Sequence, residues 1–157
     1  MTSAVQYKIV VDGDACPVKK EIADTAASFN LQVLLVSSFD HLLKGAGHVS
    51  TVQVDRSDQS ADLYIANHIA RGDVVVTGDY GLAALALAKG CHVISFRGQN
   101  YSNENIDFML DQRHVSAKAR KQGKYGKGPR KFTEEDRVFF QHKLTKLLQK
   151  LQENQLS

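Results

Sequence analysis

Three acidic residues follow apolar runs of the kind that form buried strands. Asp12 and Asp14 come just after the run 9–11, and Asp79 comes shortly after the run 74–76. Carboxylates that point into one cleft repel each other unless a cation bridges them or one keeps its proton. Because Mg²⁺ and Mn²⁺ are hard ions that take oxygen ligands, the pattern predicts a divalent metal site.

Three further residues could support this site. Asp62 falls in the first turn of an expected helix and could reach the same cleft, although the helix dipole alone explains an acid there. Thr77 could orient a carboxylate or a water molecule. Cys16 lies at an expected helix start, where a thiol pKa falls, but we expect it to cap or pack. The predicted catalytic residues are Asp12, Asp14 and Asp79, and the predicted metal ligands are Asp12, Asp14, Asp62 and Asp79.

The alternative interpretation of these acids is structural. Acidic residues after strands are often turn residues or helix caps, with no ligand to bind. For one such residue that interpretation is preferable. Because Asp12, Asp14 and Asp79 follow two separate apolar strands, we favour a site for the three together.

The net charge of +3 is unevenly distributed along the chain. The segment 112–133 holds eight lysines and arginines and no acidic residue, within a chain that is otherwise acidic on balance. Such a segment can bind a nucleic-acid backbone by counterion release, and an aromatic ring can stack on a base. We expect a mobile basic loop over 113–132 that contacts RNA. Its predicted contact residues are Arg113, Lys118, Arg120, Lys121, Lys124, Tyr125, Lys127, Arg130 and Lys131.

Apolar runs alternate with helical patterns along the chain, which predicts an α/β fold. We expect a three-layer, parallel five-stranded sheet in a single domain over 1–157, with a C-terminal amphipathic helix over 133–153. If the first and fourth strands are neighbours, their acids converge at the carboxyl edge of the sheet. No apolar run reaches the roughly 18 residues that span a membrane. The two cysteines show no metal-ligand spacing, and no signal peptide is evident, so we expect a cytoplasmic protein with reduced thiols.

Four motifs resemble a known family. They are Val-Asp-Gly-Asp-Ala-Cys-Pro-Val-Lys, Ser-Ala-Asp-Leu-Tyr-Ile-Ala, Val-Val-Thr-Gly-Asp-Tyr-Gly-Leu-Ala and Gly-Pro-Arg-Lys-Phe-Thr. Together they are similar to the YaiI/YqxD family of bacterial proteins, over about residues 8–150. That family is similar in turn to PIN-like nuclease domains, a more distant relation.

The PIN resemblance implies a metal-dependent ribonuclease that acts on RNA phosphodiester bonds. By position, Asp12 and Asp79 match the PIN acids after the first and fourth strands. Asp62 stands where PIN domains have a helical acid, commonly Glu. A further PIN acid, expected soon after Asp79, has no counterpart in 80–88. Asp14 is a candidate substitute.

Two other functions fit the same residues. The first stretch also resembles the Asp-x-Asp of haloacid-dehalogenase phosphatases. Asp12 would then be the nucleophile and Asp14 the general acid, Ser37 would bind phosphate, and Gly78–Asp79 would hold the metal. The third possibility is a non-catalytic RNA-binding module.

Overall fold

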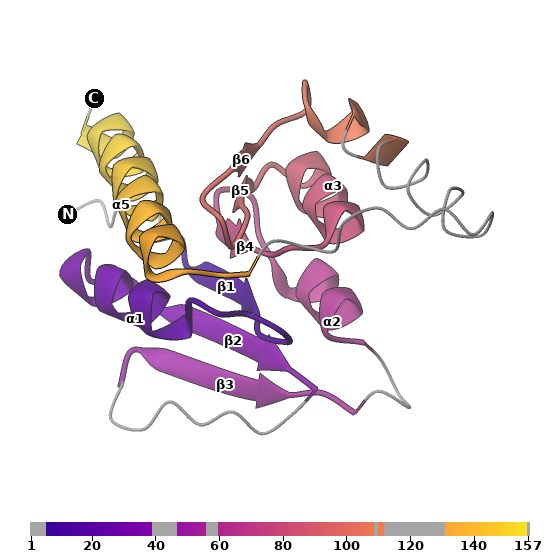
Figure 1. Ribbon diagram of the computed structural model, residues 1–157, viewed down its shortest axis with the longest axis horizontal. Helices are drawn as coiled ribbons and strands as arrows, with labels where there is room; N and C mark the ends of the chain where they lie inside the picture. The colour runs from indigo at the N-terminus through magenta and orange to yellow at the C-terminus, as the bar shows by residue number, and fades with distance from the viewer. Residues whose placement is uncertain (1–5, 39–46, 56–59, 109, 112–130, 157) are drawn as a thin grey trace.

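A mixed sheet forms the centre of the protein, with strand order β3-β2-β1-β4-β5-β6 (Figure 1). The computed structural model describes residues 6–38, 47–55, 60–108, 110–111 and 131–156. The strands are β1 (Ile9–Asp12), β2 (Val33–Ser37), β3 (Val49–Gln53), β4 (Val74–Val76), β5 (His92–Ile94) and β6 (Asn100–Tyr101). The helices are α1 (Lys19–Ser28), α2 (Ala61–His68), α3 (Tyr80–Ala88) and α5 (Glu134–Leu156).

The prediction of a five-stranded, wholly parallel sheet is wrong by one strand. Strands β1 to β5 are parallel to one another, but β6 pairs with β5 in the antiparallel direction. A turn makes this pairing possible: Ser95 Oγ accepts hydrogen bonds from the N–H groups of Arg97 and Gln99, and Gly98 has φ +85°. A strand of two residues is too short to show an alternating pattern, so the sequence did not indicate β6.

Each face of the sheet is covered by helices. Ile9 and Val11 face one core, which contains Phe140 and Leu144 of α5, while Val10 faces the other. Figure 1 shows α1 and α5 on one side and α2 and α3 on the other. Because successive strand residues point to opposite faces, a strand covered on both sides reads as an unbroken apolar run. The three layers are therefore the predicted ones.

The C-terminal helix begins at a capping box. The backbone N–H of Asp136 donates to Thr133 Oγ1 at 3.2 Å, and the N–H of Thr133 donates to Asp136 Oδ2 at 2.9 Å. This reciprocal pair satisfies N–H groups that the first turn leaves without partners. The helix then buries Phe140, Leu144 and Leu148 completely. The predicted amphipathic helix is thus confirmed, and within the described residues no helix is long and apolar enough to cross a membrane.

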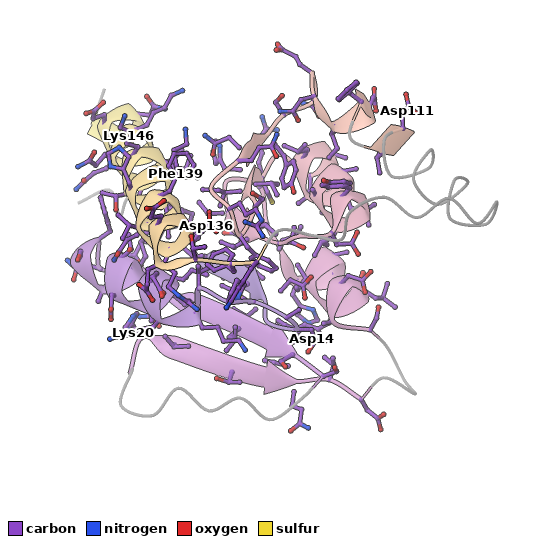
Figure 2. The ribbon with its side chains drawn as sticks, viewed as in Figure 1. Asp14, Lys20, Asp111, Asp136, Phe139 and Lys146 are labelled. Atoms are coloured by element: carbon purple, nitrogen blue, oxygen red, sulfur yellow. The ribbon has the colours of Figure 1, made fainter. Side chains whose placement is uncertain are left out.

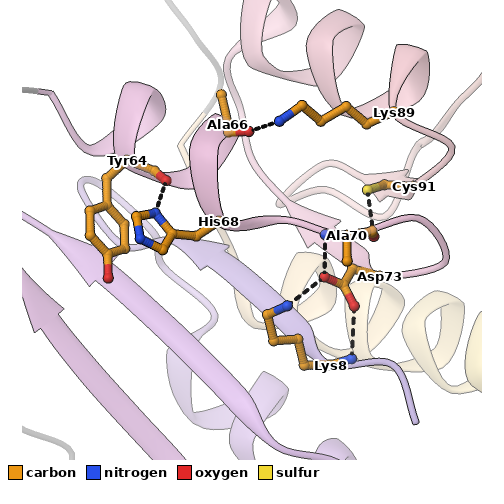
Figure 3. A network of polar contacts seen from close by, with 8 residues as sticks. All are labelled: Lys8, Tyr64, Ala66, His68, Ala70, Asp73, Lys89 and Cys91. Atoms are coloured by element: carbon orange, nitrogen blue, oxygen red, sulfur yellow. Dashed lines mark hydrogen bonds and ion pairs between the residues drawn. The ribbon is translucent and has the colours of Figure 1, made fainter. Parts of the chain in front are cut away.

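The amino end of β4 is fixed by a buried ion pair (Figure 3). Asp73 Oδ2 accepts from Lys8 Nζ at 2.7 Å and from the Ala70 N–H at 2.8 Å. Its Oδ1 accepts from the Lys8 N–H at 3.1 Å. The Asp73 side chain is only 4% exposed. These contacts tie the start of β4 to the start of β1.

Candidate functional site

The carboxyl ends of β1 and β4 bring two of the predicted acids together. Val11 pairs with Val76 in the parallel register, so Asp12 and Thr77 follow at the same level of the sheet. Thr77 Oγ1 donates to Asp12 Oδ2 at 3.1 Å and accepts from the Asp79 N–H at 3.0 Å. The fully buried Thr77 hydroxyl therefore links the two acids.

Asp79 is also the N-cap of α3. Its Oδ1 accepts from the N–H groups of Gly81 at 2.7 Å and Leu82 at 3.3 Å. Asp79 therefore has the capping role that the structural interpretation predicts. A functional role is compatible with this, because Asp79 also lines a cavity. A Cβ on Gly78 would lie 3.1 Å from the Phe96 ring, so glycine allows that ring to approach.

Asp14 is held at the end of β2. The Gly13 N–H donates to Val36 O at 2.7 Å, and a Cβ on Gly13 would lie only 2.9 Å from that oxygen. This close approach needs glycine. It places Asp14 Oδ1 where the Ser37 hydroxyl and the Ser38 N–H each donate at 3.0 Å, and Oδ2 where the Ser38 hydroxyl donates at 2.8 Å. Figure 2 labels Asp14 at this edge of the sheet.

All four predicted metal ligands line two adjoining cavities, which we call the acidic cavity. Asp12, Asp14 and Asp79 line both parts, whose volumes are about 510 and 380 Å³. Asp62 lines the smaller part, from the first turn of α2. The structure therefore places the four carboxylates around one opening, at the edge where parallel sheets bind ligands.

The acidic cavity disfavours negative charge on Asp12. Burial is the main effect that raises the pKa of Asp12 to about 6, and the Thr77 hydrogen bond opposes it. The charges of Asp14, Asp79 and Asp62 raise it further. Among the described residues, no lysine or arginine lines the acidic cavity. A bound cation would relieve this repulsion.

Carboxylate oxygens are the ligand type that Mg²⁺ and Mn²⁺ prefer. In the part of the chain that the structure describes, however, no group of three or more His, Cys, Asp or Glu residues is arranged to hold a metal ion. Magnesium commonly binds through one or two carboxylates and keeps several waters. The four acids therefore suit a hydrated ion better than an ion enclosed by protein ligands.

The other predicted residues differ in where they lie. Cys16 is buried in the core beside α1, and burial raises the pKa of its thiol to about 12. That environment agrees with packing and opposes a reactive thiolate. Lys131 is exposed just before α5. The remaining residues of the predicted RNA contact, from Arg113 to Arg130, lie outside the described residues.

Two aromatic side chains, which the sequence analysis did not predict, lie beside the acids. Tyr80 and Phe96 line the larger part of the acidic cavity beside Asp79, and Tyr80 packs edge-on against Tyr101 at 5.8 Å. Because Tyr80 directly follows Asp79 in the chain, the sequence could have predicted that Tyr80 lies near the site. Phe96 carries no such signal, because only the pairing of β5 with β4 brings it to this edge.

The fold and site define an α/β protein whose mixed sheet carries an acidic cavity at its carboxyl edge. The chain belongs to the family described as "Uncharacterized BCR, YaiI/YqxD family", whose model matches residues 10–150. A UPF0178 protein from Listeria welshimeri is 45% identical over 142 residues, covering 90% of this chain and 95% of that protein. A UPF0178 protein from Oceanobacillus iheyensis is 49% identical over 135 residues, covering 85% and 92%. The predicted family resemblance is confirmed.

A solved structure also shows similarity. The chain matches Rae1 (YacP) from Bacillus subtilis, as the W164L mutant, with a TM-score of 0.39 and 18% identity. The match covers 90% of this chain and 98% of that chain. At this TM-score the likeness carries no argument about function.

Proposed function

We propose that this protein is a metal-dependent ribonuclease that hydrolyses RNA phosphodiester bonds in the acidic cavity. One observation carries the proposal: four acidic residues, drawn from β1, the turn after it, α2 and the start of α3, line the two adjoining parts of the acidic cavity. Clustered acids with a perturbed pKa in a cleft are typical of functional sites. The resemblance to PIN-like domains, through Asp12 and Asp79, supports the same activity.

The metal would be Mg²⁺ or Mn²⁺. Asp12 and Asp79 are the candidate direct ligands, because both line the two parts of the acidic cavity and the Thr77 hydroxyl connects the Asp12 carboxylate to the Asp79 backbone N–H. Asp14 and Asp62 line the same opening and could act through water. A metal held there supplies an activated water and neutralises charge on the phosphodiester.

The chain's own residues would orient these ligands. The Thr77 hydroxyl fixes one oxygen of Asp12, and Ser37 and Ser38 fix both oxygens of Asp14. The α3 cap fixes one oxygen of Asp79. Such partners hold ligands in place before the ion and the substrate arrive, which reduces the reorganisation that binding requires.

One contact bears on the phosphatase alternative. That function needs the Ser37 hydroxyl to bind phosphate, but Ser37 is fully buried and its hydroxyl donates to Asp14. The residues of the acidic cavity that the structure describes include no lysine. The Ser37 contact favours phosphodiester over phosphomonoester chemistry.

The direct test is cleavage of labelled single-stranded RNA in Mn²⁺ by the wild type and by Asp12→Asn and Asp79→Asn. Asparagine at 79 keeps an N-cap side chain, so the substitution removes charge without removing the cap. Asp24→Asn, at an exposed position of α1, is the matched control. We expect cleavage to fall by at least about 100-fold in both site variants and to persist in the control.

Other outcomes would point to the alternatives. Hydrolysis of small phosphomonoesters through a trappable acyl-phosphate on Asp12 would identify a phosphatase. Salt-sensitive RNA binding without turnover, in the wild type with Mn²⁺ present, would identify a binding module. Cleavage that survives Asp12→Asn would place the activity outside the acidic cavity.

A further inference from the structure

A second cavity lies where α5 packs beside the β5–β6 edge of the sheet. Its volume is about 490 Å³, and Lys143, Lys146 and Lys150 line it from α5. His92 and Asn100 line it from the sheet. We call this cavity the lysine groove. Figure 2 labels Lys146 on α5 and Asp14 at the other charged region, the acidic cavity.

Three lysines of α5 give the lysine groove its positive charge. Lys143, Lys146 and Lys150 are spaced i, i+3 and i+7, so they lie on one face of α5 and extend over about 10 Å of helix. Of the described residues that line the groove, none is acidic. The local field also acts on His92, whose pKa is lowered by burial and by the charge of Lys150. An anion bound there would meet no opposing carboxylate among the lining residues.

The packing of α5 fixes where the lysines lie. A Cβ on Gly98, in the β5–β6 turn, would lie 3.1 Å from Lys143 Cγ and 3.2 Å from the Phe139 ring. The first turns of α5 therefore press on that turn, and the buried Leu144 and Leu148 hold the helix against the sheet. The rotation of α5 is set by its core, so the row of ammonium groups is directed along the sheet edge.

The size and lining of the groove favour a polymer over a single phosphate. Three cations spread over about 10 Å suit several phosphates in a row better than one. Asn100, Ser102 and Asn103 add hydrogen-bonding side chains opposite them. Strand β5 and the turn after it connect the two charged regions, because His92 at the start of β5 lines the groove and Phe96, two residues beyond the end of β5, lines the acidic cavity.

We propose that the lysine groove binds the sugar–phosphate backbone of a single-stranded RNA, as a second contact for a strand that also enters the acidic cavity. The choice of RNA as the polymer rests on the proposed function. The groove itself rests on its own charge and geometry. The same chemistry could recognise the phosphates of a free nucleotide, so the test includes both.

The experiment measures binding of a labelled single-stranded RNA in EDTA, as a function of salt, for the wild type, Lys146→Ala/Lys150→Ala and Lys146→Arg/Lys150→Arg. Both lysines are exposed, so all three proteins should melt alike. Loss of two phosphate contacts should reduce the slope of log K against log salt by about 1.4. The arginine pair keeps both charges and should retain the wild-type slope.

Each outcome decides the proposal. A wild type that binds no RNA, or an alanine pair with the wild-type slope, overturns it. ADP or pyrophosphate that binds the wild type, fails to bind the alanine pair and leaves RNA binding unaffected assigns the groove to a small phosphate ligand and also overturns it. If the slope falls as expected but the wild type cleaves no RNA in Mn²⁺, the groove stands and the ribonuclease proposal fails.

Discussion

Asp73 and Asp12 lie at opposite ends of the neighbouring strands β4 and β1, and their surroundings are opposite in kind. Asp73 accepts from the Lys8 ammonium and from two backbone N–H groups. Asp12 accepts from the neutral Thr77 hydroxyl and is repelled by three other carboxylates. One acid is compensated by the protein, and the other is placed where its charge is costly.

This difference separates a structural acid from a candidate functional one. A buried carboxylate with a cation and backbone donors fixes the fold, and removing it leaves other groups without partners. A carboxylate whose ionisation is disfavoured by its neighbours lowers the free energy of unfolding, a cost that natural proteins commonly accept where they bind ligands. The same residue type in one sheet therefore has two roles, distinguished by what surrounds it.

The largest effect is expected at the structural end. Asp73→Ala removes the acceptor of the Lys8 and Ala70 N–H groups, so the free energy of unfolding should fall by about 3 kcal/mol. Urea denaturation followed by circular dichroism measures this. A change below about 0.5 kcal/mol would contradict the structural role of Asp73.

Asp12→Asn should change the free energy of unfolding in the opposite direction. In EDTA, removing the repelled charge should raise the free energy of unfolding at pH 7 by about 1–2 kcal/mol, after allowance for partial exposure. Its folded pKa, about 6, exceeds the unfolded value of about 3.9. The penalty is therefore absent below about pH 4, grows up to about pH 6 and is complete above it. Denaturation curves across this range measure it, and a less stable Asp12→Asn at pH 7 would show that the environment of Asp12 is misjudged.

A bound divalent metal should compensate the charge of Asp12, as Lys8 compensates that of Asp73. At Mg²⁺ or Mn²⁺ concentrations about tenfold above Kd, binding to the folded state should stabilise the wild type by about 1.4 kcal/mol. Thermal melts with and without metal detect this as a higher Tm. Asp12→Asn should lose the shift, whereas the exposed control Asp24→Asn should keep it. An equal shift in all three proteins would locate metal binding elsewhere.

The smallest expected effect is on the pKa of Asp12 when the Thr77 hydroxyl is removed. Because the Thr77 hydrogen bond lowers the pKa of Asp12 against the effect of burial, Thr77→Val should raise that pKa further, by about half a unit to one unit. Thr77→Ser keeps the hydroxyl and is the control. Carboxyl chemical shifts recorded during a pH titration in EDTA measure the change. A Thr77→Val titration curve that overlays the wild type would mean that the hydroxyl leaves Asp12 unaffected.

The sequence by itself predicted the layers and most of the residues that line the candidate site. The unbroken apolar runs before Asp12 and Asp79 are typical of strands covered on both faces, and the helical stripes supply that cover. The sequence predicted that the acids converge only if β1 and β4 are neighbours in the sheet. The observed strand order places these two strands side by side. Four acids could therefore be assigned to one edge before their contacts were known.

Only the tertiary structure decided how each acid is surrounded. The local sequence places Asp73 before one apolar run and Asp12 after another, but it does not show that Asp73 meets Lys8 and that Asp12 meets three acids. The pairing of β6 and the rotation of α5, which align three lysines along a sheet edge, were hidden for the same reason. Local patterns report which elements form, whereas burial and the charges that a side chain meets depend on residues distant in the chain.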